Sequence, residues 1–276
     1  MNARTTLIST EIISISPSLA AEMLQANTAN RPLDKRRAAR MALMIKRGEW
    51  MMNGDAIRFS VTNVLLDGQH RLTAIWKSGV TVQSLVVRGL PDESFKTIDV
   101  GGRARTTSDV LAIKGEKNYT HLASSASLLY KFLVSGNPLN GNPDNQPTAK
   151  QIESLIDANP NIRNSVDSIA RMKWVLRHVT GSIGGFCHYV FSNKDANAAA
   201  SFFEKLESGV GLDAGSPILH LRERLTDNIG GKEAIKKHYK TALMFKAFRL
   251  YLDDASIKNL RVRTSGDAPE KDLFTL

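Results

Sequence analysis

The chain has 276 residues, of which 42% are hydrophobic and 23% are charged, and its formal net charge is +10. These proportions are ordinary for a globular protein, and no apolar run approaches the roughly 20 residues that span a bilayer, so we expect no membrane segment. The single cysteine, Cys187, excludes an intrachain disulfide. No basic segment precedes an apolar core near the start, so we expect no secretory signal and a cytoplasmic location. The excess of basic residues favours an anionic partner, and for a cytoplasmic protein the usual anionic partner is nucleic acid.

The first part of the chain predicts an α/β unit. Ile57 and Phe59 alternate with polar residues, and Val64-Leu65-Leu66 is a continuous apolar run, as in strands. Ala38 and Ile45 recur at helical spacing in a basic segment. In chain order we expect a strand at 10–15, helices at 19–26 and 33–47, strands at 56–60 and 63–66, a helix at 71–78 and a strand at 81–88.

A basic loop closes this part of the chain. Residues 95–100 form an apolar stretch that we expect to be a buried strand, and Gly101-Gly102-Arg103-Ala104-Arg105 follows it. Together with Asp99, Arg103 and Arg105 could contact phosphates; the alternative is an interdomain hinge. We place the end of the first domain at residue 115.

The second half, residues 116–276, predicts an all-helical domain. Its helices are expected at 121–134, 148–157, 160–178, 182–191, 195–206, 217–228 and 231–252, and a loop rich in Asn, Gly and Pro at 135–147. The last helix and the tail are basic, which favours contact with a nucleic-acid backbone or a partner protein. The residues predicted to contact nucleic acid are Lys236, Lys237, Lys240, Arg261 and Arg263.

The most informative stretch is Asp67-Gly68-Gln69-His70-Arg71, between an expected strand and an expected helix. Such a turn exposes backbone amides and the positive end of the helix dipole, which together bind anions. Gly68 allows close approach of the backbone, Arg71 can hold phosphate with two donors, and His70 can donate to a phosphate oxygen. Asp67 can hold a metal-bound water or accept amide hydrogen bonds.

The context of this turn resembles a known family. Asn30-Arg31-Pro32, the helix through Met44 to Gly48, the strand pair, Leu66 to Ala74 and Lys77-Ser78-Gly79 follow one another at the spacings of the ParB/sulfiredoxin-like domain, over about residues 8 to 90. The resemblance implies that the turn binds the phosphates of ATP, CTP or a related nucleotide. The Asp-Gly-Gln-His-Arg variant is similar to a subgroup of phage and DNA-modification-linked proteins, with which nucleotide hydrolysis or DNA nicking is associated.

Departures from the family pattern reduce the number of activities that the resemblance allows. Sulfiredoxins need a cysteine within this turn, where the chain has Gln69, so sulfiredoxin chemistry is excluded. Chromosome-partitioning ParB proteins carry Glu and Arg where this chain has Gln69 and His70, which argues against a partitioning clamp. The catalytic carboxylate of the related free-serine kinases has no matched position here.

The resulting prediction is a ParB/sulfiredoxin-like nucleotide-binding domain followed by an all-α domain, in an NTPase that uses Mg²⁺ and acts on or along DNA. Three alternatives stay open: a phosphotransferase, a nuclease with the same carboxylates, and a non-enzymatic nucleotide-gated DNA-binding regulator. A homodimer is also left open. The predicted catalytic residues are His70, Arg71, Asp67 and Glu49; the nucleotide-binding residues are Gly68, Gln69, His70, Arg71, Arg103 and Arg105; the metal ligands are Asp55 and Asp67.

Overall fold

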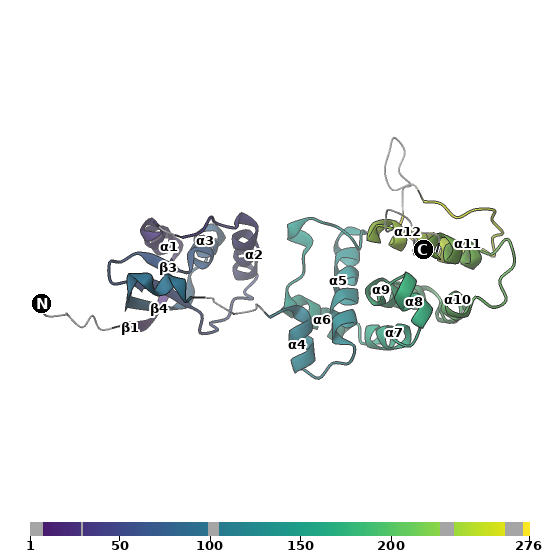
Figure 1. Cartoon of the computed structure of the whole chain (residues 1–276), viewed down its shortest axis with the longest axis horizontal. Helices are drawn as coiled ribbons and strands as arrows, with labels where there is room; N and C mark the ends of the chain where they lie inside the picture. Colours follow the sequence, from purple (N-terminus) through teal and green to yellow (C-terminus); the bar gives the residue numbers. More distant parts are fainter. Residues whose placement is uncertain (1–7, 29, 99–104, 227–234, 263–272) are drawn as a thin grey trace, which may run out of the picture. The chain divides into compact units, whose positions relative to one another are not determined.

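The computed structural model describes residues 8–28, 30–98, 105–226, 235–262 and 273–276. The chain divides into two compact units, residues 1–104 and 105–276. The first is a mixed four-stranded sheet with helices, and the described residues of the second form helices without a sheet (Figure 1). The boundary expected at residue 115 lies beyond α4 (Thr107–Ile113), which the structure assigns to the second unit. No described helix has the length and apolarity required to cross a membrane.

The sheet of the first unit has the strand order β1-β4-β2-β3. Its strands are β1 (Ser9–Ile15), β2 (Ala56–Ser60), β3 (Leu65–Asp67) and β4 (Val82–Leu90). β4 is antiparallel to β1 and parallel to β2, and β2 is antiparallel to β3. The central strand β2 is buried except at Arg58, which lies opposite Asp67 of β3.

Three helices cover one face of this sheet (Figure 1). They are α1 (Pro17–Met23), which continues into the 3-10 helix η1 (Leu24–Ala26), α2 (Lys35–Lys46) and α3 (Gln69–Ser78). Ile57 and Leu65 of the strands pack with Leu72 and Ile75 of α3 in one buried cluster. Burial of each such side chain contributes about 1.5–3 kcal/mol to folding.

Two expectations for the first unit need correction. Helix α3 begins at Gln69 rather than at Arg71, because Gly68, with φ +107°, serves as its N-cap directly after β3. The buried strand expected from Phe95 is wrong within the described residues. Phe95 belongs instead to the 3-10 helix η2 (Asp92–Lys96), which starts after Pro91, and its side chain is 54% exposed. Residues 99–104, including Asp99 and Arg103, lie outside the described residues.

Helix α9 (Gly181–Lys194) is the centre of the second unit and contacts α5, α7, α8, α10 and α12. Gly184 and Gly185 allow this close packing: a Cβ on Gly184 would lie 2.9 Å from Ile169, and one on Gly185 would lie 2.6 Å from Ser125 Oγ. The other helices, besides α4 and the 3-10 helix η3 (Pro143–Asn145), are α5 (Tyr119–Ser135), α6 (Ala149–Ala158), α7 (Asn161–Ile169), α8 (Lys173–His178), α10 (Ala196–Ser208), α11 (Pro217–Thr226) and α12 (Lys237–Leu252).

The single helix expected at 160–178 is wrong, because the chain breaks there into α7 and α8. The carboxylate of Glu207, from α10, accepts the backbone N–H groups of Trp174 and Val175, each at 3.1 Å. These bonds satisfy amides at the start of α8 that would otherwise lack partners, since Met172 at the N-cap has no capping side chain. A contact so distant in sequence leaves no trace in local periodicity.

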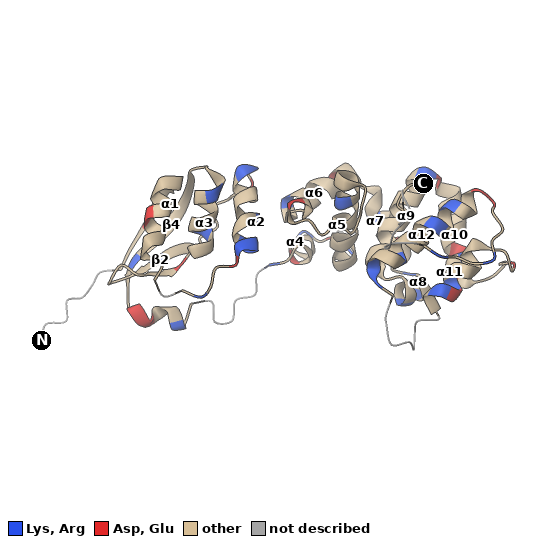
Figure 2. Ribbon diagram, turned by 90° about the horizontal axis from the view of Figure 1, so that it is seen from above, with Lys and Arg blue, Asp and Glu red and all other residues tan. Residues whose placement is uncertain are grey.

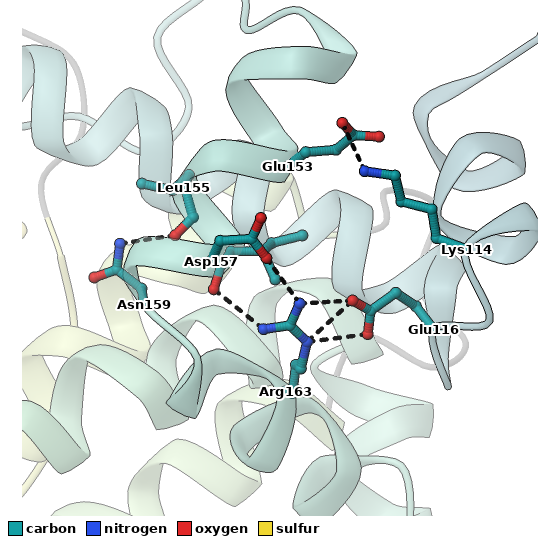
Figure 3. A network of polar contacts seen from close by, with 8 residues as sticks. Lys114, Glu116, Glu153, Leu155, Asp157, Asn159 and Arg163 are labelled. Atoms are coloured by element: carbon teal, nitrogen blue, oxygen red, sulfur yellow. Dashed lines mark hydrogen bonds and ion pairs between the residues drawn. The ribbon is translucent and has the colours of Figure 1, made fainter.

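A polar network connects the segment after α4 with α6 and α7 (Figure 3). Arg163 of α7 donates through Nε and Nη2 to Glu116, with a shortest distance of 2.6 Å, and through Nη2 to Asp157 at 3.2 Å. Lys114 and Glu153 form a neighbouring ion pair at 3.0 Å. The hydrogen bonds with Glu116 raise the pKa of Arg163 above its usual value.

Candidate functional site

The turn between β3 and α3 requires glycine at position 68. Its φ of +107° is strained for residues with a side chain, and a Cβ there would lie 3.0 Å from Ile57 Cγ1 and 3.2 Å from Ile57 Cα. No side chain caps the start of α3. The first-turn amides therefore have no capping side chain as acceptor, and the positive end of the helix dipole lies at the turn.

A small pocket of about 120 Å³ lies beside this turn. Four arginines from different parts of the unit line it: Arg31 from the segment before α2, Arg37 from α2, Arg58 from β2 and Arg71 from α3. The remaining lining residues are Met41, Asp55, Asp67, Gly68 and His70. Four guanidinium groups against two carboxylates leave an excess of positive charge, which suits a multiply charged anion.

Asp67 positions two of these arginines. Its Oδ2 accepts a hydrogen bond from Arg58 Nη1 at 2.5 Å and lies 3.8 Å from Arg71 Nη2, while its Oδ1 accepts the Gly68 N–H at 2.7 Å. Arg71 Nη1 also donates to the backbone carbonyl of Asp55 at 2.6 Å. Each oxygen of Asp67 thus already accepts one hydrogen bond from within the protein.

His70 is buried, at 9% exposure, and its Nε2 accepts the backbone N–H of Asp34 at 3.1 Å. The neutral ring therefore carries its proton on Nδ1, and Nε2 cannot donate to a phosphate. Burial, followed by the positive charges of Arg37 and Arg31, lowers the pKa of His70 below its usual value, which outweighs the opposite effect of the nearby carboxylates. If His70 donates a hydrogen bond to a phosphate oxygen as expected, only its Nδ1 can do so.

Gln69 and Asn30 hold the segment before α2 against the turn. Gln69 Nε2 donates to the carbonyl of Arg31 at 3.0 Å, and Gln69 Oε1 accepts from Asn27 Nδ2 at 3.3 Å. Asn30 Nδ2 donates to the carbonyl of Leu65 at 2.6 Å and to Asn27 Oδ1 at 2.7 Å. These bonds place the Arg31 backbone beside α3 and take up both ends of the Gln69 amide.

A larger pocket of about 350 Å³ adjoins the small one and shares Arg31, Asp67 and His70 with it. Val64, Phe95 and Ile98 give it an apolar side, and its lining is completed by Asn30, Leu65, Leu66 and Gln69. The first unit thus has a half-apolar pocket next to a cationic one.

The other predicted site residues have different environments. Glu49 follows α2 and lines neither pocket, and its buried Oε2 has no hydrogen-bond partner among the described residues. Asp55 lines the small pocket, where its Oδ2 accepts from Asn53 Nδ2 at 3.4 Å. Arg105 is exposed and belongs to the second unit. Within the described residues, no three His, Cys, Asp or Glu side chains gather in a way that could hold a metal ion.

Three arginines of the small pocket were missing from the predicted site: Arg31, Arg37 and Arg58. Arg58 had a usable signal, because a charged residue inside an apolar strand needs a partner, and Asp67 faces it across the strand pair. For Arg37 the sequence offers no comparable signal, because Arg36 and Arg40 are also basic residues of the same helix. Only the packing of α2 beside α3 distinguishes them.

The basic residues predicted to contact nucleic acid have different environments. Lys240 is half-buried, burial lowers its pKa, and its Nζ donates to the carbonyl of His178 at 2.5 Å. Lys236, Lys237 and Arg261 are exposed, and Lys237 also lines a pocket of the second unit. Arg263 lies outside the described residues. Figure 2 shows basic residues on several helices of this unit rather than on α12 alone.

The two adjoining pockets of the first unit form the candidate functional site. The resemblance to the ParB/sulfiredoxin-like domain stays a prediction. No family model, curated protein or solved structure matches the chain.

Proposed function

We propose that the first unit is a ParB/sulfiredoxin-like domain that binds a nucleoside triphosphate, and that the protein hydrolyses this nucleotide with Mg²⁺ while acting on or along DNA. One observation carries the proposal: four arginines surround the β3–α3 turn in a pocket that adjoins a half-apolar pocket. The net charge of +10 supports DNA as the partner.

In this proposal the phosphates lie in the small pocket. Arg37 and Arg58 provide charge-assisted hydrogen bonds, and the first-turn amides of α3 provide further donors. Asp67 holds Arg58 in place, and Gly68 keeps the backbone close to the phosphates. The predicted grip of Arg71 on phosphate is limited by its existing bond to the Asp55 carbonyl.

The base and sugar lie in the larger pocket, against Val64, Phe95 and Ile98. A planar base gains by stacking on an aromatic ring or by covering apolar surface. The amide nitrogens of Asn30 and Gln69 donate to other parts of the protein, and we assign no base preference to these residues. ATP and CTP therefore both remain candidates.

Binding is tested with Arg37→Gln and its matched control Arg36→Gln. Both arginines are exposed on the first turn of α2, but only Arg37 lines the pocket. Loss of one charge-assisted contact, about 1.5–3 kcal/mol, should weaken ATP or CTP binding by roughly tenfold or more in Arg37→Gln. Arg36→Gln should bind like the wild type in titration calorimetry. Equal affinity of all three proteins would contradict the proposed phosphate position.

The assignment of the base to the larger pocket is tested with Phe95→Ala. This change removes an exposed ring from the pocket lining and leaves the arginines in place. Binding of the nucleotide should weaken, whereas binding of inorganic triphosphate, which has no base, should stay at the wild-type level. An equal loss for both ligands would place the base elsewhere.

Turnover is proposed to depend on Asp55. It is the carboxylate of the small pocket that has no ion pair with a described residue. Mg²⁺ bound mostly by phosphate oxygens and water needs only one or two protein carboxylates. Asp55→Asn should retain nucleotide binding and lose release of the labelled terminal phosphate. Transfer of the label to an acceptor would indicate a phosphotransferase, and nicking of plasmid DNA with metal alone would indicate a nuclease.

A nucleotide-gated DNA-binding regulator without turnover is the second candidate. It is favoured because Asp67 and His70, the expected catalytic groups, are both bound within the protein. In this case DNA affinity should change on addition of nucleotide, and no phosphate should be released with or without DNA. Phosphate release that is lost in Arg37→Gln would reject this second candidate.

A further inference from the structure

The second unit contains its own pocket, of about 410 Å³. It lies among the start of α4, one face of α5, and the first turns of α9 and α12. Hydroxyl groups form much of its polar lining, including those of Thr107, Ser124, Ser127 and Ser182. Hydroxyl groups adapt readily to a bound ligand, because each one can donate or accept a hydrogen bond.

Two lysines, Lys131 of α5 and Lys237 of α12, also line this pocket, and no carboxylate does. Neither ammonium group has a hydrogen bond or ion pair to the described part of the chain. Burial lowers the pKa of Lys131 below its usual value. A partly buried ammonium without an opposite charge is unfavourable, and a bound anion would compensate for it.

Two helix starts add positive potential beside the lysines. α9 has 14 residues, α12 has 16, and neither has a capping side chain at its start. Ser182 and Lys237, from these first turns, line the pocket. The α9 N-cap, Thr180, has φ +92°, which β-branched residues rarely adopt. The positive ends of both helix dipoles therefore favour an anion in the pocket.

An apolar wall lies opposite these donors, formed by Leu128, Leu139 and Ile183. A site for inorganic phosphate or for a nucleic-acid backbone alone would have no use for such a wall. Two lysines match the double negative charge of a phosphomonoester better than the single charge of a phosphodiester. The combination suits a small molecule with a phosphate group and an uncharged body.

We propose that this pocket binds a phosphomonoester, with the phosphate between Lys131 and Lys237 and the uncharged body against the Leu128–Leu139–Ile183 wall. Ser127 and Ser182 supply further hydrogen bonds. The site is independent of the nucleotide site proposed for the first unit, because all its residues belong to the second unit.

The test is a site-resolved footprint on the full chain, with phenyl phosphate as the probe. Lysines are acetylated with and without the probe, and mass spectrometry gives the rate at each position. Phenyl phosphate should slow acetylation of Lys131 and Lys237 and leave exposed Lys150 of α6 unchanged. Because the rate is read at these lysines, binding of the probe to the first unit does not affect the result.

Variants then test the pairing of the two lysines. In Lys131→Gln, protection of Lys237 should need about tenfold more probe, as expected for the loss of one charge-assisted contact. Lys150→Gln, which removes the same charge from the same unit, should leave the protection unchanged. If Lys131→Gln does not fold, Lys237→Gln with Lys131 as the reporter gives the reciprocal measurement.

Three results would overturn the proposal. The first is no protection of either lysine in the wild type. The second is equal protection of Lys237 in the wild type and in folded Lys131→Gln. The third is stronger protection by single-stranded DNA than by phenyl phosphate at equal phosphate concentration, which would assign the pocket to a nucleic-acid backbone.

Discussion

Replacement of Gly68 by alanine tests the geometry on which the candidate site depends. The residue has φ +107°, where a side chain costs about 1–2 kcal/mol. The new Cβ would lie 3.0–3.2 Å from atoms of Ile57, including its Cα, and crowding against backbone adds about 1–3 kcal/mol. The reduced freedom of the unfolded chain offsets about 0.4–1 kcal/mol. Gly68→Ala should therefore destabilise the first unit by about 1–4.5 kcal/mol, with a central value of about 3 kcal/mol.

Gly79→Ala is the matched control. Gly79 ends the same helix with φ +73°, and a Cβ there would meet no atom within 4 Å. Its cost should be only about 1 kcal/mol, from the backbone alone. Hydrogen exchange of β2 and β4 at increasing urea measures the opening free energy of the first unit apart from the second. Equal losses in the two variants would refute the claim that close approach to Ile57 requires glycine at position 68.

Three further predictions concern ionisable groups. Because the pKa of His70 is lowered, its neutral form stabilises the fold above about pH 6.5, and this stability should decline as the pH falls through the folded pKa. In an NMR titration, the Asp34 amide should shift with the same midpoint as the His70 ring, and a different midpoint would contradict the prediction. Lys236→Gln should reduce the salt dependence of DNA binding by about one unit of slope, whereas Lys240→Gln should lower the melting temperature without changing that slope. Arg163→Ala should destabilise the second unit by about 1–3 kcal/mol, because it leaves the Glu116 carboxylate without its partner. Hydrogen exchange of α6 and α7 measures this loss, and exchange at the wild-type rate in both helices would reject the structural role of the network.

Local patterns predicted most elements of this chain. β2 was recognised by its alternation of Ile57 and Phe59, and both side chains are buried. The helix after Asp34 was recognised by apolar spacing, and Ala38 and Ile45 indeed face the core. Local patterns failed to predict the break between α7 and α8, where Glu207, far away in the sequence, accepts hydrogen bonds from the first amides of α8.

The candidate site was predicted only in part for the same reason. The turn at 67–71 could be located because a strand, a glycine and a helix follow one another directly, and this order is local. The roles of its side chains depend on hydrogen-bond partners from other elements. Arg58 donates to Asp67, and the backbone N–H of Asp34 donates to His70. A sequence shows which groups are able to bind, whereas the fold decides which of them are already bound.

By itself, the sequence determined an α/β unit followed by helices, and a tight turn at Gly68 between a strand and a helix, because secondary structure and turns depend on neighbours along the chain. Only the tertiary structure decided that Arg31, Arg37 and Arg58 meet at this turn. It also decided that Lys131 and Lys237 share a pocket of the second unit. Charged side chains far apart in sequence leave no periodic signal, and the packing of helices and strands alone brings them together.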